Sequence, residues 1–295
     1  MRCRNREQMG VDPGGERTKD PSRGRNRSER YALAILGLGA LGLYMLGTQR
    51  LATENRRLRR RNDKLELETH TDSLTGLRNR RYFLETVDRD TSLVDRLHVD
   101  SPDDVPREGV DYLLLFFDLD DFKEINDRYG HGVGDRVLVQ VRWLLENTFR
   151  ESDDLVRWGG DEFLVVGRHT HRAAAPQIAE RLRRQIAGHP FQIGHGETCR
   201  VTCSIGFACY PFQPGEPGRL GWRDVLTLAD RAQYIAKRSG GNAWAWLQPS
   251  EGTALQSADA LAARIATDTE GMVRDGWLTV ETSAERAALG RFRGV

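Results

Sequence analysis

The sequence predicts an α+β fold, in which a central, mostly antiparallel sheet of about five strands is flanked by helices. Residues 112–117 form an uninterrupted apolar run of strand length, YLLLFF. Residues 155–158 and 163–167 are two short apolar runs on either side of the turn Gly159-Gly160-Asp161-Glu162. Because glycines support tight turns between paired strands, this pattern indicates a β-hairpin.

The other elements of this domain follow along residues 71–247. Helices are predicted at residues 79–97, 122–128, 134–149, 172–187 and 222–238, and one more strand at 200–210. Strands paired by a hairpin, with helices between the others, predict helices packed on the sheet. Residues 248–295 form a C-terminal extension with scattered helical propensity and no assignable role.

The N-terminal region differs in composition from this domain. Residues 1–30 are rich in Arg, Gly, Pro, Ser and Asp, which predicts a disordered basic segment. Residues 31–47 carry no charge and would extend about 26 Å as a helix. A single transmembrane helix is therefore predicted at residues 31–48, in a bacterial inner (cytoplasmic) membrane with the C-terminal domain in the cytoplasm. A buried helix of a soluble domain is the alternative interpretation.

Residues 49–70 are predicted to be a helical linker. Leu51, Leu58 and Leu65 recur every seven residues, and Asn55 and Asn62 recur on the same seam. Leucine and asparagine at these heptad positions favour a short parallel two-stranded coiled coil, and therefore a homodimer. A solvated single helix with leucines at this spacing by chance is the alternative.

The charge balance argues against one class of partner. The chain has 44 basic and 43 acidic residues, a formal net charge of +1, so it is not expected to bind nucleic acid. Its four cysteines show neither paired nor zinc-type spacing, which favours reduced thiols in a cytosolic domain.

Acidic residues stand at two turns of the predicted sheet. Asp118 directly follows a strand expected to be buried, and Asp161 and Glu162 follow the two glycines of the hairpin. Adjacent carboxylates repel one another, and a divalent cation would remove that cost. Mg²⁺ is commonly held by one or two carboxylates together with substrate phosphates, as in palm-type nucleotidyl transfer. Asp120 and Asp121 precede a helix and are interpreted as N-caps.

Other polar residues suggest a nucleotide. Asn126 and Asp135 offer an amide and a carboxylate, and a carboxylate matches the N1–H and N2 amine of guanine. Lys123 and Lys237 supply charge for phosphates. Each of these residues alone is equally consistent with a solvated surface position.

Taken in order, these residues stand in blocks that resemble the GGDEF family of diguanylate cyclases. The resemblance covers about residues 70–247. Its blocks are DSLTGLRNRR at 72–81, FDLDDFKEIND at 117–127, YGHGVGD at 129–135, GGDEF at 159–163, VTCSIGFA at 201–208, AD at 229–230 and AK at 236–237. The resemblance implies a palm-like domain that condenses two GTP into cyclic di-GMP and two pyrophosphates as a homodimer.

The resemblance also implies roles for individual residues. Asp118, the backbone of Leu119, Asp161 and Glu162 would hold Mg²⁺ or Mn²⁺. Asp161, supported by Glu162, would be catalytic and help to deprotonate the attacking 3′-hydroxyl. The implied substrate-binding residues are Phe122, Lys123, Asn126, His131, Asp135, Gly160 and Lys237.

Two positions depart from the family pattern. After Lys237 the family usually has Gly-Arg-Asn, whereas this chain has Gly240-Gly241-Asn242 and lacks the phosphate-gripping arginine. Gln233 stands where an apolar residue is usual. The alternative function is therefore a catalytically inactive domain that binds GTP or cyclic di-GMP and signals by contact. A membrane scaffold is the other rival.

An R-x-x-D motif precedes the hairpin. Arg150 and Asp153 have the spacing that marks the product-inhibition site in the family, and Arg181 is a further candidate for that site. Arginine suits a cyclic dinucleotide because its planar fork binds phosphate and stacks on guanine. A solvated helix end is the alternative. The expected partners are thus GTP, cyclic di-GMP as product and inhibitor, a second copy of the chain, and a membrane.

Overall fold

The computed structural model describes residues 70–100, 110–250, 253 and 256–284, together with residues 45, 49 and 50. Residues 65–295 form one compact unit. The predicted disordered segment at 1–30 lies outside the described residues. So does the predicted coiled-coil linker at 49–70, apart from residues 49, 50 and 70.

The prediction of a transmembrane helix, and with it the placement in a bacterial inner membrane, is contradicted. Among the residues that the structure describes, no helix is long and apolar enough to cross a bilayer. The uncharged run at 31–47 is shorter than the roughly 20 apolar residues that a span needs. It also contains four glycines, each of which costs a helix about 1 kcal/mol relative to alanine. Most of the predicted span at 31–48 lies outside the described residues.

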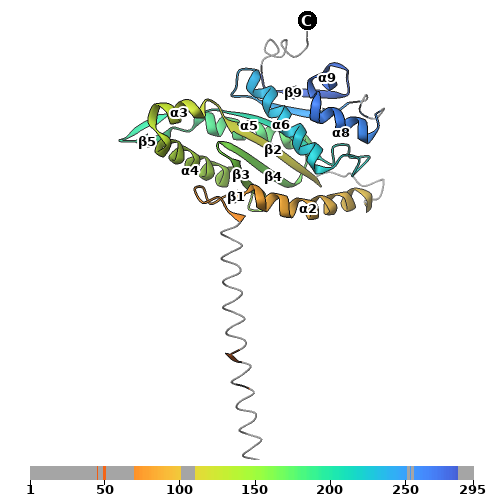
Figure 1. Cartoon of the computed structure of the whole chain (residues 1–295), viewed down its shortest axis with the longest axis horizontal. Helices are drawn as coiled ribbons and strands as arrows, with labels where there is room; N and C mark the ends of the chain where they lie inside the picture. Colours follow the sequence, from red (N-terminus) through yellow and green to blue (C-terminus); the bar gives the residue numbers. More distant parts are fainter. Residues whose placement is uncertain are drawn as a thin grey trace, which may run out of the picture. The chain divides into compact units, whose positions relative to one another are not determined.

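A seven-stranded sheet in the order β1-β3-β4-β2-β7-β8-β9 forms the centre of the compact unit (Figure 1). Its strands are β1 (Arg78–Asn79), β2 (Asp111–Leu119), β3 (Asp154–Gly159), β4 (Glu162–Thr170), β7 (Cys203–Tyr210), β8 (Trp244–Pro249) and β9 (Leu278–Thr282). A separate two-stranded sheet pairs β5 (Phe191–Gly194) with β6 (Glu197–Cys199).

The large sheet is mostly antiparallel, as predicted. Strand β2 pairs antiparallel with β4 and β7, β3 with β4, and β8 with β9. The parallel pairs are β1 with β3 and β7 with β8. The β3–β4 pair confirms the predicted hairpin. Strands β1, β8 and β9 were not predicted by residue range, because they are short and show little alternation.

Helices cover both faces of this sheet. They are α2 (Arg80–Asp100), α3 (Phe122–Tyr129), α4 (His131–Thr148), α5 (Ala175–Gly188, after the short 3-10 turn Arg172–Ala174), α6 (Trp222–Arg238), α8 (Ala258–Thr267) and α9 (Thr269–Arg274). Strand side chains alternate between faces, so β2 feeds two cores. Leu114 and Phe116 join the core with α2 and α6, and Leu113, Leu115 and Phe117 join the core with α4 and α5.

Part of the C-terminal extension folds against this domain. Strand β9 extends the sheet by pairing with β8, and Leu261 and Ile265 of α8 join the α2–α6 core. The Arg231 guanidinium of α6 donates to the Ala266 carbonyl at 3.3 Å. The extension is therefore packed on α6, the helix that also contacts Asp118.

Candidate active site

The two predicted groups of carboxylates meet at one edge of the sheet. Asp118 stands one residue before the end of β2, only 8% exposed, and its neighbours in register are Glu162 on β4 and Ser204 on β7. Asp161 occupies the β3–β4 turn immediately before Glu162. Strand pairing thus brings together residues more than 40 positions apart, and we call Asp118, Asp161 and Glu162 the acidic edge.

Helix α6 contributes the donors that contact Asp118. Gln233 Nε2 donates to Asp118 Oδ1 at 2.6 Å, and the Lys237 ammonium forms an ion pair with Asp118 Oδ2. Gly206 allows this close approach of the helix. A Cβ on Gly206 would lie 1.8 Å from the backbone nitrogen of Gln233 and 2.2 Å from the carbonyl oxygen of Ala229. Any side chain at Gly206 would therefore push α6 away from the sheet.

Two carboxylates of the acidic edge, Asp118 and Glu162, have raised pKa values. Burial raises the pKa of Asp118, and the bond to Lys237 only partly offsets this rise. Burial also raises the pKa of Glu162, and repulsion from Asp161, Asp230 and Asp118 adds to it. Burial lowers the pKa of Lys237, but the hydrogen bond to Asp118 and the attraction of nearby carboxylates together outweigh burial, so that the net pKa is raised. The edge thus has more carboxylates than cations.

This donor set fits a divalent cation that also binds phosphate. Among the described residues, no three or more His, Cys, Asp or Glu side chains converge into a ready-made metal centre. Mg²⁺ does not require one, because it commonly takes one or two protein carboxylates and fills its other positions with water and substrate phosphates. Burial and then mutual repulsion raise the pKa of Glu162, and a raised carboxylate pKa is expected at such a site.

The hairpin turn is held by a residue to which the sequence analysis gave no role. Arg157 donates from Nε and Nη2 to the Gly160 carbonyl, at 3.0 and 2.8 Å, and from Nη1 to Asp72 Oδ1 at 2.9 Å. Asp72 also accepts from the backbone N–H and the hydroxyl of Thr75, at 2.8 and 2.7 Å. Arg157 therefore ties the turn that presents Asp161 to the loop before α2. No local pattern signals this contact, because its partners are 85 positions apart.

The predicted guanine-binding residues lie on two successive helices. Asn126 is on α3, and His131 and Asp135 are exposed in the first turns of α4. Gly134 permits the helices to close, since a Cβ there would lie 2.1 Å from Asn126 Oδ1. Phe122 and Lys123 begin α3, with Phe122 buried and Lys123 exposed. These residues follow the end of β2, on the chain segment directly after Asp118.

Asp120 and Asp121, the two predicted N-cap residues, make different contacts. Asp121 occupies the N-cap position of α3 in a left-handed conformation, φ 55°, without a side-chain capping bond. Asp120 accepts hydrogen bonds from the hydroxyls of Thr202 and Ser204, both at 2.6 Å, and from the backbone N–H of Asn242 at 2.8 Å. Asp121 is therefore the N-cap residue by position, although its side chain makes no capping bond. The interpretation of Asp120 as a cap is wrong, because Asp120 instead anchors the loop that follows α6.

Gly241 in this loop has two reasons to be glycine. Its φ is +71°, and a Cβ would lie 3.1 Å from Cγ and Oδ2 of Asp120. The glycine that replaces the usual arginine is thus adapted to a turn closed against Asp120. On the other side of the loop, Arg183 Nη1 donates to Asn242 Oδ1 at 2.9 Å.

The R-x-x-D residues line a separate cavity. Its volume is about 350 Å³, and its lining includes Arg150, Asp153 and Arg181. The backbone N–H of Arg150 donates to Asp153 Oδ2 at 3.0 Å, and Arg181 Nη2 donates to the Thr148 carbonyl at 3.0 Å. Leu113 also lines the cavity, five residues or about 17 Å along β2 from Asp118. The structure thus brings the three residues together, away from the acidic edge.

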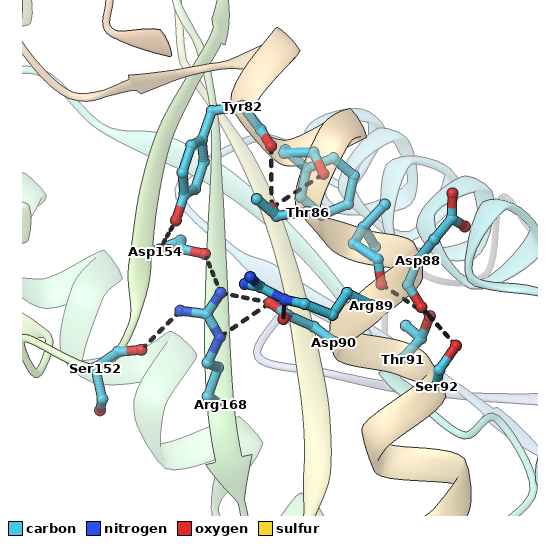
Figure 2. Close-up of polar contacts among 12 residues, drawn as sticks. Tyr82, Thr86, Asp88, Arg89, Asp90, Thr91, Ser92, Ser152, Asp154 and Arg168 are labelled. Carbon is cyan, nitrogen blue, oxygen red and sulfur yellow. Dashed lines mark hydrogen bonds and ion pairs between the residues drawn. The ribbon is translucent and has the colours of Figure 1, made fainter. Parts of the chain in front are cut away.

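Arg168 connects this motif to helix α2 (Figure 2). From β4, its guanidinium pairs with Asp90 of α2 at 2.5 Å and with Asp154 of β3 at 2.7 Å. It also donates to the Ser152 carbonyl at 3.2 Å, inside the R-x-x-D segment (Figure 2). The loop bearing Arg150 and Asp153 is therefore fixed to the helix that follows the Asp72 loop.

The fold is a palm-like α+β domain, and its acidic edge has a set of carboxylates that suits a divalent cation. Residues 69–243 match the family model described as "Diguanylate cyclase, GGDEF domain". The chain belongs to the GGDEF family.

Similar proteins agree with this assignment. The response regulator PleD of Caulobacter vibrioides is 40% identical over 174 residues, which are 59% of this chain and 35% of that protein. Diguanylate cyclase SiaD of Pseudomonas aeruginosa, solved with its activator SiaC, aligns at 30% identity with a TM-score of 0.57, over 75% of this chain and 78% of that chain. The coiled coil and GGDEF domain of DgcB from Caulobacter crescentus, solved with c-di-GMP, aligns at 27% identity with a TM-score of 0.55, over 65% of this chain and 92% of that chain. The chain spans less than half the length of curated relatives such as PleD.

Proposed function

We propose that this chain is a diguanylate cyclase, which condenses two GTP into cyclic di-GMP and releases two pyrophosphates. The observation that carries the proposal is the acidic edge, where Asp118 is in register with Glu162 beside Asp161 and meets the Lys237 ammonium. Its excess of carboxylates over cations suits a divalent ion and a polyphosphate. Named diguanylate cyclases among the similar proteins support the same reaction.

In this proposal, each domain binds one GTP through its own side chains. Asn126 and Asp135 recognise guanine, with His131 beside them, and Lys123 and Lys237 contact the phosphates together with the backbone of Phe122 and Gly160. Asp161, supported by Glu162, accepts the proton of the attacking 3′-hydroxyl. Asp118, the backbone of Leu119, Asp161 and Glu162 would hold Mg²⁺ or Mn²⁺, which would neutralise phosphate charge and lower the barrier to in-line attack.

The chemistry calls for two domains face to face, because each 3′-hydroxyl attacks the α-phosphate of the other GTP. A two-fold symmetric homodimer satisfies that requirement. We further propose that cyclic di-GMP inhibits the enzyme at the cavity lined by Arg150, Asp153 and Arg181. The c-di-GMP complex of DgcB supports the general capacity of GGDEF domains to bind this product.

The test is to incubate the purified full chain with GTP and either Mg²⁺ or Mn²⁺ and to measure cyclic di-GMP by mass spectrometry. Asp161→Ala is expected to reduce the rate at least 10³-fold, within the range lost when a general base is removed. Asp259→Ala, at an exposed position on α8, is the matched control and should retain the wild-type rate. Failure of folded wild-type protein and Asp161→Ala alike to form product would overturn the enzyme proposal and favour a nucleotide-binding signalling domain.

A further inference from the structure

Gln233 has an unusual position for a buried amide. It is only 7% exposed, and its Nε2 donates to Asp118 Oδ1 at 2.6 Å. A carboxylate only accepts hydrogen bonds, so the amide must present its nitrogen to Asp118. An apolar side chain of similar volume would fill this space but would leave the buried Oδ1 of Asp118 without a donor.

The backbone of Gln233 cannot shift easily. A Cβ on Gly206 would lie only 1.8 Å from the backbone nitrogen of Gln233, so α6 packs directly on β7 at this residue. Strand β7 in turn pairs with β2, the strand that carries Asp118. The reach of the Gln233 side chain to Asp118 is therefore set by strand pairing and helix packing.

The two oxygens of Asp118 meet different kinds of donor. Oδ1 accepts from a neutral amide, whereas Oδ2 meets the positively charged Lys237 ammonium, one helical turn further along α6. A divalent cation at Asp118 would repel the Lys237 ammonium far more strongly than the neutral Gln233 amide. Lys237 would therefore leave Oδ2 more readily than Gln233 would leave Oδ1.

We propose that Gln233 is a positioning residue for the metal-binding carboxylate: it holds Oδ1 of Asp118 so that Oδ2 is offered to the cation. This proposal rests on the proposed function, since the cation belongs to the diguanylate cyclase reaction. Residues that hydrogen-bond to a metal ligand fix its orientation, and their loss typically weakens metal binding about 10- to 100-fold. Gln233 thus gives this chain an orienting contact at a position where the family usually has an apolar residue.

The experiment measures Mn²⁺ binding to the full chain by electron paramagnetic resonance, with a GTP analogue that cannot react at the α-phosphate. Gln233→Met keeps the volume but removes the donor, and is expected to weaken Mn²⁺ binding about tenfold. Gln233→Glu replaces the donor with a charged acceptor and should weaken it further. Gln248→Met, the same substitution at a surface position on β8, should bind Mn²⁺ like the wild type.

The outcomes separate three roles of Gln233. Weaker binding by Gln233→Met, with the melting temperature of the metal-free protein unchanged, supports positioning. Equal binding by Gln233→Met and wild type would mean that Gln233 only fills space, and tighter binding by Gln233→Glu would mean that residue 233 itself faces the cation; either result overturns the proposal. Absence of Mn²⁺ binding and of cyclic di-GMP formation in the wild type would instead overturn the proposed function, and this inference with it.

Discussion

The acidic edge and the R-x-x-D cavity carry opposite imbalances of charge within one domain. At the acidic edge, the pKa values of Asp118 and Glu162 are raised by burial, with mutual repulsion adding to the rise at Glu162, and Lys237 is the cation that pairs with Asp118. In the cavity, Arg150 and Arg181 stand beside the single carboxylate of Asp153. The first arrangement suits a cation, and the second suits an anion.

In each of these two regions, the charge of the protein is left unbalanced, and a ligand of the opposite charge would balance it. Other charged groups of the domain are matched by partners: Arg168 pairs with Asp90 and Asp154, and Arg172 with Asp111. Those pairs connect secondary-structure elements. Unmatched charge costs stability in the ligand-free protein, so the imbalance at the acidic edge and at the R-x-x-D cavity supports the ligands proposed for them.

Among the variants that test this comparison, the largest effect is expected at the cavity. Arg150→Ala removes a guanidinium that would bind the phosphates of cyclic di-GMP, and loss of such charge-assisted bonds corresponds to a rise of about 100-fold in the inhibition constant. The initial rate at low product should be unchanged, because the cavity lies about 17 Å along β2 from Asp118. Inhibition assays would compare it with Arg184→Ala, an exposed arginine on α5 that is not among the lining residues. Equal inhibition of both variants would mean that Arg150 does not bind the product, and the proposed contrast between the two regions would be wrong.

A second prediction concerns the clamp on the hairpin turn. Arg157→Leu removes the bonds to Gly160 and Asp72, so Asp161 is presented less rigidly and kcat should fall about tenfold, with a smaller change in KM. Asp72→Asn should produce part of the same loss. If the two residues act through one contact, the double variant will be no worse than Arg157→Leu alone. Strictly additive losses in steady-state kinetics would show that they act independently.

The third prediction concerns the departure at Gly241. Gly241→Arg restores the residue usual in the family, yet KM for GTP should rise about fivefold, because a non-glycine residue at φ +71° costs roughly 1–2 kcal/mol and its Cβ contacts Asp120. The resulting loop shift would move Lys237. Gly215→Arg, at a position with open space, is the control. A lower KM for Gly241→Arg would show instead that the site is simply missing a phosphate contact.

The smallest effect is on stability. Because the folded pKa of Glu162 is raised above its usual 4.5, the ionised carboxylate costs stability above that raised pKa, and the cost vanishes at pH values below 4.5. For so exposed a group, the cost is a few tenths of a kcal/mol. Metal-free Glu162→Gln should therefore melt about 1 °C higher than wild type at pH 8 and equally at pH 4, by differential scanning calorimetry. A lower melting temperature at pH 8 would contradict the excess of negative charge at the acidic edge.

Local patterns predicted most of the elements that carry the site. The apolar run before Asp118 and the glycine turn before Asp161 identified β2 and the β3–β4 hairpin, because strand length and turn chemistry are encoded by neighbouring residues. The same reasoning failed at residues 31–48, where lack of charge was taken for a membrane span. It also missed β9, whose place in the sheet depends on pairing with β8, about 30 positions earlier in the chain.

The sequence by itself determined which residues are the candidates for the chemistry: ordered motifs pointed to the acidic edge, the predicted guanine-binding residues and the R-x-x-D residues. Only the tertiary structure decided how these residues are held. The bond of Gln233 to Asp118, the clamp of Arg157 on Gly160 and Asp72, and the turn of Gly241 against Asp120 each join segments that local periodicity does not relate, apart from the contact of Arg157 with its own hairpin. The physical reason is that motifs record residue type and spacing along the chain, whereas positioning depends on strand register and helix packing across it.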